Sequence, residues 1–174
     1  GEIIEAFFMP LVEAQYAIDV IDPSVSLEDY NVILSPMLLY LNESGLCDRL
    51  KKWIRDGGTW VAGPMTDIRT EHCTKFVHSP FGILEEWTGA RCRWQIIGNV
   101  EEPIFEVKFQ DSTITGGRVW YDVFEIPSNA EILGTYQNAR LKNQVAAFSV
   151  RFGKGIIIVL GSVPSGKDIV SLLA

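Results

Sequence analysis

Hydrophobic residues near the start of the chain recur at the spacing of an α-helix. The apolar positions are Ile3, Ile4, Phe7, Phe8, Leu11 and Val12. At 3.6 residues per turn they form a broad apolar stripe, and Pro10 inside it predicts a kink. In α/β folds such a helix covers a sheet whose first strand precedes it. We therefore expect a fragment of a larger chain, with the first strand missing before Gly1.

The next segments alternate between short apolar strands and one clear helix. Predicted strands are Ile18 to Ile21, Val32 to Leu34 and Thr59 to Ala62. Between the last two, a helix begins near Asn42, which can cap it, and stops at Gly57-Gly58. This strand–helix–strand order predicts parallel strands joined by a right-handed crossover.

The rest of the chain begins with a polar loop over residues 63–79. Ser79-Pro80 is expected to open a helix that ends at Gly89, and Arg91 to Ile97 reads as a strand. Beyond Val100 the pattern is mostly that of antiparallel strands. These are expected around 105–109, 119–123, 131–136, 145–152 and 155–160, with a tight turn at 152–155 and a helix from Ile169 to Ala174.

Composition narrows the possible classes of protein. The chain has 174 residues, 47% of them hydrophobic, which fits one folded domain over residues 1–174. The net charge is −7 and no run of Lys or Arg occurs, so neither nucleic acid nor a membrane surface is an expected partner. The apolar run from Ile156 to Leu160 is far short of the ~20 residues that span a membrane. Three widely spaced cysteines favour a reducing compartment, so we expect the cytoplasm.

The most specific motif is Gly161 to Lys167, which has the glycine and lysine spacing of a phosphate-binding loop. The next residue is Asp168, where that motif needs a Ser or Thr hydroxyl for magnesium. We therefore interpret the segment as a strand-to-helix turn and expect no cofactor.

Catalytic and metal-binding residues are sparse. The only histidines are His72 and His78, and a nucleophile such as Cys73 needs a histidine close in space. A metal site would have to combine these three residues with Cys47 and Cys92, yet no paired spacing of ligands occurs.

Acidic pairs and aromatic residues also have structural interpretations. The acidic pairs Glu85-Glu86 and Glu101-Glu102 are neighbours that point apart, unlike the facing carboxylates of a glycosidase. We expect Trp53 and Trp87 in the core and partial exposure of Trp94, Trp120 and Tyr121. The sequence thus predicts no catalytic, cofactor-binding or metal-binding residue.

Several segments resemble the middle domain of family 42 β-galactosidases. The block from Tyr30 to Leu41, the helix that follows and the strand GTWVAGP are similar to that family, as is Asp19 to Pro23. Arg69 to His72, Pro80 to Gly89 and the turn Phe152 to Gly155 fit as well, whereas residues 100–140 match loosely. The resemblance implies a flavodoxin-like, class I glutamine amidotransferase-like three-layer sandwich with a mainly parallel sheet and added antiparallel strands in the second half. It also implies a homotrimer-forming, non-catalytic domain, attached to a barrel that hydrolyses terminal β-galactosides.

Two other functions remain open at this stage. A divergent amidotransferase-like hydrolase would use Cys73 with His72 or His78. The turn Gly63-Pro64-Met65 lacks the cysteine of amidotransferases, and the segment after Leu160 lacks their histidine. A sugar- or nucleotide-binding module would place its ligand at the carboxyl ends of the parallel strands.

Overall fold

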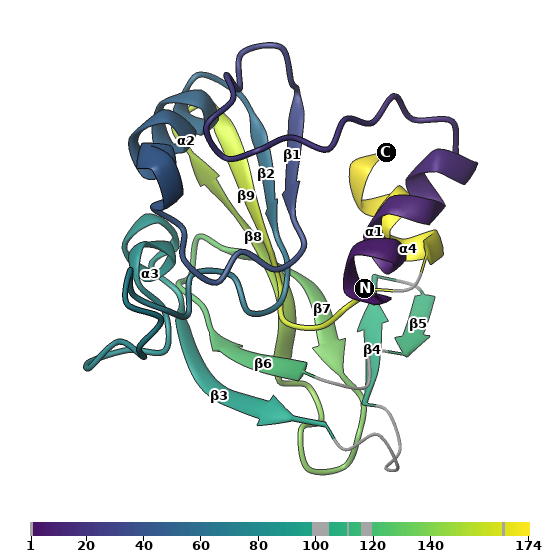
Figure 1. Ribbon diagram of the computed structural model, residues 1–174. Coiled ribbons are helices and arrows are strands. Elements are labelled where there is room, and N and C mark those ends of the chain that lie inside the picture. Colours follow the sequence, from purple (N-terminus) through teal and green to yellow (C-terminus); the bar gives the residue numbers. More distant parts are fainter. Residues whose placement is uncertain (1, 99–104, 111, 116–119, 165) are drawn as a thin grey trace.

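A computed structural model describes residues 2–98, 105–110, 112–115, 120–164 and 166–174 (Figure 1). The helices are α1 (Glu2–Glu13), α2 (Leu46–Arg55), α3 (Ile83–Thr88) and α4 (Gly166–Leu173), and η1 (Glu43–Gly45) is a short 3-10 helix. The strands are β1 (Val32–Ser35), β2 (Thr59–Ala62), β3 (Arg91–Ile97), β4 (Glu106–Phe109), β5 (Ser112–Thr115), β6 (Trp120–Glu125), β7 (Glu131–Tyr136), β8 (Val145–Phe152) and β9 (Gly155–Leu160).

The described strands form one mixed sheet. Its order is β1-β2-β9-β8-β7-β4-β5, and β6 joins it by pairing with β8 on one side and with β3 on the other. The β1–β2 and β2–β9 pairings are parallel, and every other described pairing is antiparallel. The prediction of a mainly parallel sheet is therefore wrong. Short connections such as the turn between β8 and β9 allow antiparallel pairing alone, whereas parallel neighbours need long crossovers.

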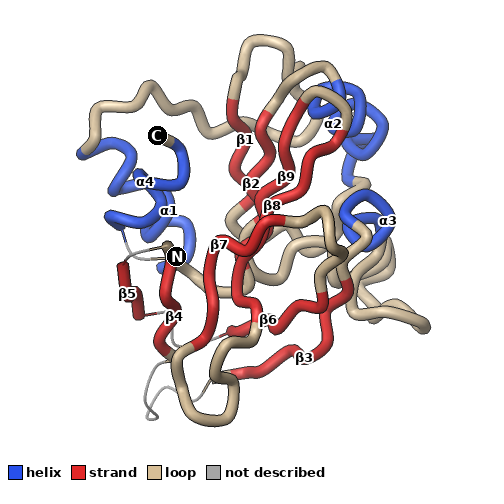
Figure 2. Tube along the Cα trace, turned by 180° about the vertical axis from the view of Figure 1, so that it is seen from behind, coloured by secondary structure: helices blue, strands red, loops and turns tan. Residues whose placement is uncertain are grey.

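Helices lie on both sides of this sheet (Figures 1 and 2). On one side α2 and α3 bury Leu50, Ile54 and Leu84 against strand residues such as Trp60. On the other side α1 and α4 pack together and cover a second core. That core includes Phe7, Val61, Tyr121, Tyr136, Leu160 and Ile169. An amphipathic helix beside each apolar sheet face removes both faces from water, which is the main favourable term in folding.

Most predicted strands are confirmed by the structure. The bounds of β7, β8 and β9 are those predicted, and β9 pairs with β2. Residues 18–21 are not a strand: they lie in an irregular segment, and Val20 is 83% exposed. Without a neighbouring strand to pair with, β-branched composition alone does not create one. The predicted strand position Val119 lies outside the described residues.

Helix starts agree less well than helix ends. The helix predicted from Asn42 begins as η1, and α2 proper starts at Leu46 and ends before Gly57 as expected. The Asn42 Oδ1 accepts the N–H of Cys47 at 3.4 Å. The last helix begins at Gly166 rather than Ile169, and the helix predicted from Pro80 begins at Ile83.

Candidate functional site

The catalytic candidates of the loop after β2 do not form a dyad. His72 is exposed, and its Nε2 lies 3.4 Å from Glu71 Oε1. Cys73 is also exposed, with a φ of 59°. Within the described residues no hydrogen bond joins Cys73 to His72 or His78, so the nucleophile–base contact that catalysis requires is not made.

The cysteines are separated by the fold. Cys47 is buried on α2 and Cys92 is buried on β3, whereas Cys73 is exposed. In the part of the chain that the structure describes, no group of three or more His, Cys, Asp or Glu side chains could hold a metal ion. Burial raises the pKa of Cys47 to about 12 and that of Cys92 still further. Both thiols are therefore protonated and weakly nucleophilic at neutral pH.

The glycine-rich segment between β9 and α4 is shaped by packing. The Gly161 N–H donates to the Ala146 carbonyl, and the Gly161 carbonyl accepts the Asp122 N–H, each over 2.8 Å. A Cβ on Gly161 would lie 2.5 Å from the Asp122 carbonyl oxygen, so only glycine fits. Asp168 is buried in the first turn of α4, where a phosphate-binding loop would direct its phosphate. Ser165 lies outside the described residues.

Asp122 on β6 is a buried carboxylate that the sequence did not indicate. Its Oδ1 accepts hydrogen bonds from Trp120 Nε1 at 2.8 Å and from Cys92 Sγ at 3.6 Å. Its main-chain carbonyl accepts the Tyr136 hydroxyl over 2.7 Å. Burial raises the pKa of Asp122 to about 7, although these side-chain donors oppose the rise. The one available signal was its position between Trp120 and Phe124, which lie on an apolar face of β6.

Two further donors lie near the Asp122 carboxylate. The backbone N–H of Met65, in the turn after β2, helps to lower its pKa, as does the Gln95 side chain opposite it in the β3–β6 register. The Gln95 Nε2 is buried and forms no hydrogen bond of normal length and angle. Met65 has a φ of 62°. The Asp122 cluster thus ties β6 to β3 and to this turn, and burial keeps its one described thiol, Cys92, protonated.

Asp67 holds the start of α3 from a distant part of the chain. Its Oδ2 accepts the Leu84 N–H over 2.6 Å, and its main-chain carbonyl accepts the Gly82 N–H over 3.0 Å. Burial raises the pKa of Asp67 to about 6, while backbone donors including Ile83 oppose the rise. This long-range cap explains why α3 begins at Ile83 rather than at the predicted Pro80.

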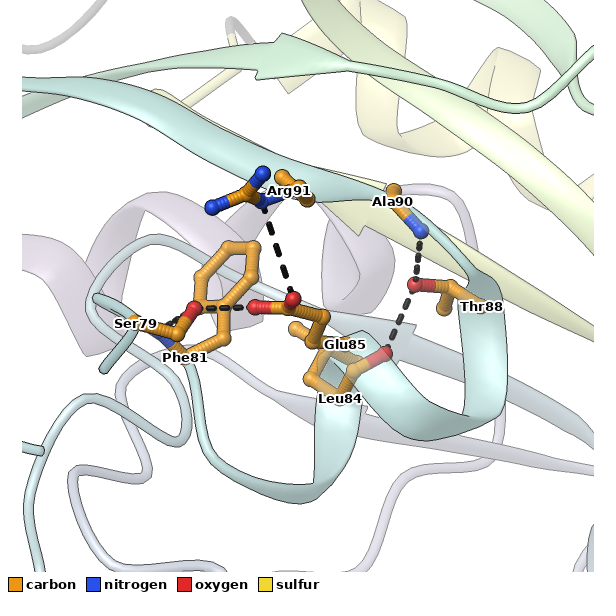
Figure 3. Close-up of polar contacts among 7 residues, drawn as sticks. All are labelled: Ser79, Phe81, Leu84, Glu85, Thr88, Ala90 and Arg91. Atoms are coloured by element: carbon orange, nitrogen blue, oxygen red, sulfur yellow. Dashed lines mark hydrogen bonds and ion pairs between the residues drawn. The ribbon is translucent and has the colours of Figure 1, made fainter.

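The acidic pair on α3 has structural partners (Figure 3). Glu85 accepts a hydrogen bond from Ser79, and its Oε1 lies 3.7 Å from Arg91 Nε. Glu86 instead lies with its Oε1 4.0 Å from Lys51 Nζ on α2. The two carboxylates serve different contacts and do not flank a common substrate position. The other predicted pair, Glu101-Glu102, lies outside the described residues.

Figure 3 also shows how α3 ends. Thr88 Oγ1 donates to the Leu84 carbonyl over 2.7 Å and accepts the Ala90 N–H over 3.1 Å. Gly89 caps the helix in the left-handed region, as predicted. These contacts lead the chain directly into β3.

Two of the hollows formed by the described residues bear on the predicted ligand site, and the larger of them lies at the opposite ends of the parallel strands. The larger, about 890 Å³, lies at the amino ends of β1 and β2, where Val32 and Thr59 line it. Its cations are already engaged: Arg49 donates to the Val25 carbonyl over 2.8 Å, and Lys52 Nζ lies 2.7 Å from Asp56. The smaller, about 280 Å³, lies beside the loop, lined by Arg69, Lys75, His78 and Gln95 among others.

The strongest surface feature on one side of the domain is α1. Its inner residues Phe7 and Leu11 are buried against the sheet. Its exposed apolar residues are Ile4, Met9, Val12 and, just beyond the helix, Tyr16. Every charged residue of α1 is acidic. The helix is therefore apolar on two sides, which is unusual for a helix with one side in water.

The second surface feature is β3, at an edge of the sheet. Among the described strands it pairs with β6 alone. Trp94 is 43% exposed, as expected, and Ile97 is 73% exposed. The Arg93 guanidinium lies 4.4 Å from the centre of the Trp94 ring and 3.7 Å from Glu125. The predicted exposure of Tyr121 is wrong, because the second core covers it.

The chain matches a known protein family over almost its whole length. The profile of the family described as "Beta-galactosidase trimerisation domain" matches residues 2–174. The chain belongs to this family.

Individual relatives show how similar the chain is to members of this family and how much of each relative it covers. β-Galactosidase YesZ of Bacillus licheniformis is 27% identical over 168 residues, which are 95% of this chain and 24% of that protein. The trimerisation domain therefore spans about a quarter of the length of the curated relatives it matches.

Solved structures share the fold. A β-galactosidase from Bacillus circulans sp. alkalophilus superposes with a TM-score of 0.89 at 18% identity, over 99% of this chain and 26% of that one. The E323A mutant of Gan42B, a GH42 β-galactosidase from G. stearothermophilus, gives 0.88 at 20% identity, over 99% and 25%.

Proposed function

We propose that this chain holds copies of a longer β-galactosidase together as a homotrimer and takes no part in hydrolysis itself. The observation that carries the proposal is the family match over residues 2–174. In relatives such as YesZ the matched segment is 24% of the protein, so about three-quarters of the length lies elsewhere. We assign hydrolysis of terminal β-D-galactosides to a barrel domain in that remainder.

The described side chains support an assembly role over the two alternatives. Cys73 lacks a histidine partner, and the turn from Gly63 to Met65 holds no nucleophile, which speaks against an amidotransferase-like hydrolase. The larger hollow lies at the amino ends of the parallel strands, opposite to where a sugar- or nucleotide-binding module of this class places its ligand.

We also propose the flavodoxin-like, class I glutamine amidotransferase-like sandwich as the fold type, and the cytoplasm as the location. Helices on both sides of the sheet and the parallel order β1-β2-β9 support the fold type. No helix in the described residues is long and apolar enough to cross a membrane. The three unpaired cysteines suit a reducing compartment.

Native mass spectrometry of the full-length protein that carries this segment tests the assembly role. We expect a trimer as the main species. A monomer over a wide range of protein concentration would refute the proposal. Thiol labelling against pH provides a second test: we expect Cys73 to react as an ordinary cysteine, whereas a strongly lowered thiol pKa would favour the hydrolase.

A further inference from the structure

We infer that the trimer interface joins the apolar half of β3 in one copy to the outer face of α1 in the next. The apolar half of β3 is Trp94 to Ile97, and the outer face of α1 comprises Met9 and Val12, with exposed Tyr16 just beyond the helix. The inference rests on the proposed trimer, because it names the surfaces that such a trimer would use.

Symmetry requires two different surfaces. A three-fold axis does not map a patch onto itself, so each copy of a closed trimer presents one patch to the copy before it and another to the copy after it. The strand β3 and the helix α1 lie on well-separated parts of the domain in both views (Figures 1 and 2). They are therefore placed to contact two different neighbours.

The composition of β3 is that of an interface centre. Trp and Arg are enriched among the residues that contribute most to binding, and here Arg93 stacks on the exposed Trp94 ring. The first half of the strand is protected from strand pairing by Arg91, Arg93 and an irregularity between Cys92 and Trp94. The second half, from Trp94 to Ile97, has no charged residue, so we expect a partner to cover it.

Charge makes α1 the matching surface. Exposed Glu5 and Glu13 flank its outer apolar residues, and the helix has no basic residue. Exposed Arg91 and Arg93 flank the apolar half of β3, and each lies 3.7 Å from one intradomain carboxylate. These long, solvent-exposed pairs leave guanidinium donors for a second carboxylate. Two copies of the acidic α1 surface would repel each other, whereas α1 and the arginines of β3 attract.

Substitutions of exposed residues test the surfaces without disturbing the core. We expect Ile97→Ser and Val12→Ser, made in the full-length protein, each to raise the trimer dissociation constant at least tenfold in sedimentation experiments. Ile132→Ser is the matched control, because Ile132 is exposed on β7, which does not pair with β3. Unchanged dissociation in either test variant, with the wild type trimeric, would overturn the inference.

Cross-linking tests the pairing itself. In a Cys73→Ser background, the double variant Val12→Cys with Ile97→Cys is treated with a short bis-maleimide. We expect covalent dimers and trimers on a denaturing gel, and monomers from either single variant. Dimers from a single variant, or no cross-links from the double variant of a trimeric protein, would refute the α1–β3 contact. A wild type that is not trimeric would instead refute the proposed function.

Discussion

At the scale of single residues, Asp122 couples the stability of the domain to pH. Burial raises the folded pKa of Asp122 to about 7, above its ordinary 3.8, so the folded state binds its proton more tightly than the unfolded state. The free energy of unfolding should therefore fall as the pH rises from 3.8 to about 7. The stabilisation that Asp122 contributes is fully present below pH 3.8. Asp67, whose pKa is raised to about 6, acts in the same direction.

Asp122→Asn should flatten that pH dependence, because the amide keeps an oxygen for Trp120 Nε1 and loses the charge. Urea unfolding at about pH 5 and about pH 8 measures the difference in stability between the two conditions. We expect the difference to be smaller in the variant than in the wild type, with a remainder from Asp67. An unchanged difference would mean that Asp122 does not titrate in this range.

Gly161 provides a second prediction at this scale. The Cβ of Gly161→Ala would lie 2.5 Å from the Asp122 carbonyl oxygen and 2.9 Å from that of Ala146, so two strands must shift. We expect a loss of about 2–3 kcal/mol in the free energy of unfolding. Gly45→Ala is the comparison, because its Cβ meets nothing within 4 Å and costs only its left-handed φ, roughly 1 kcal/mol. Equal losses would show that the strands tolerate the added carbon.

At the scale of elements, a local hydrophobic pattern predicts a strand correctly where the folded sheet also provides a neighbouring strand to pair with. β7, β8 and β9 alternate or run continuously apolar, and a tight turn joins β8 to β9, so their bounds can be read from sequence. Residues 18–21 have the same β-branched character but no neighbouring strand, so they remain irregular. The start of α3 depends on Asp67, which no local pattern connects to Ile83. Contacts between residues distant in sequence, such as this cap, cannot be read from local patterns.

The long-range cap gives an element-scale prediction. Asp67→Ala removes the acceptor for the Leu84 N–H and leaves buried donors at the start of α3. We expect a loss of about 1–3 kcal/mol and faster hydrogen exchange at Ile83 and Leu84 than in the wild type. The variant Asp29→Ala, at an exposed position, should change stability by less than about 0.5 kcal/mol. Unaltered exchange at the first turn of α3 would show that the helix start does not depend on Asp67.

At the scale of the whole molecule, the apolar stripe predicted for the first helix turns out to serve two surfaces. Phe7 and Leu11 are buried, while Met9 and Val12 are exposed. The sequence alone could not separate the buried apolar residues of the helix from the exposed ones, because their burial depends on how α4 packs beside α1. Likewise, Trp94 was expected to be partly exposed, but its place on an edge strand follows from the sheet order. Burial of such surfaces in an assembly links folding to association.

That linkage leads to a concentration-dependent melting temperature. If the folded state is a trimer and the unfolded chain is monomeric, the unfolding equilibrium depends on the square of protein concentration. Each tenfold increase in protein concentration then stabilises the trimer by about 2.7 kcal/mol, which is twice the roughly 1.36 kcal/mol that corresponds to a tenfold change in an equilibrium constant. Thermal unfolding from about 1 to about 100 µM should show a steadily rising midpoint. Ile97→Ser should need higher concentrations to reach the same midpoint, whereas Ile132→Ser should follow the wild type. A midpoint independent of concentration in the wild type would mean that unfolding is not coupled to trimer dissociation.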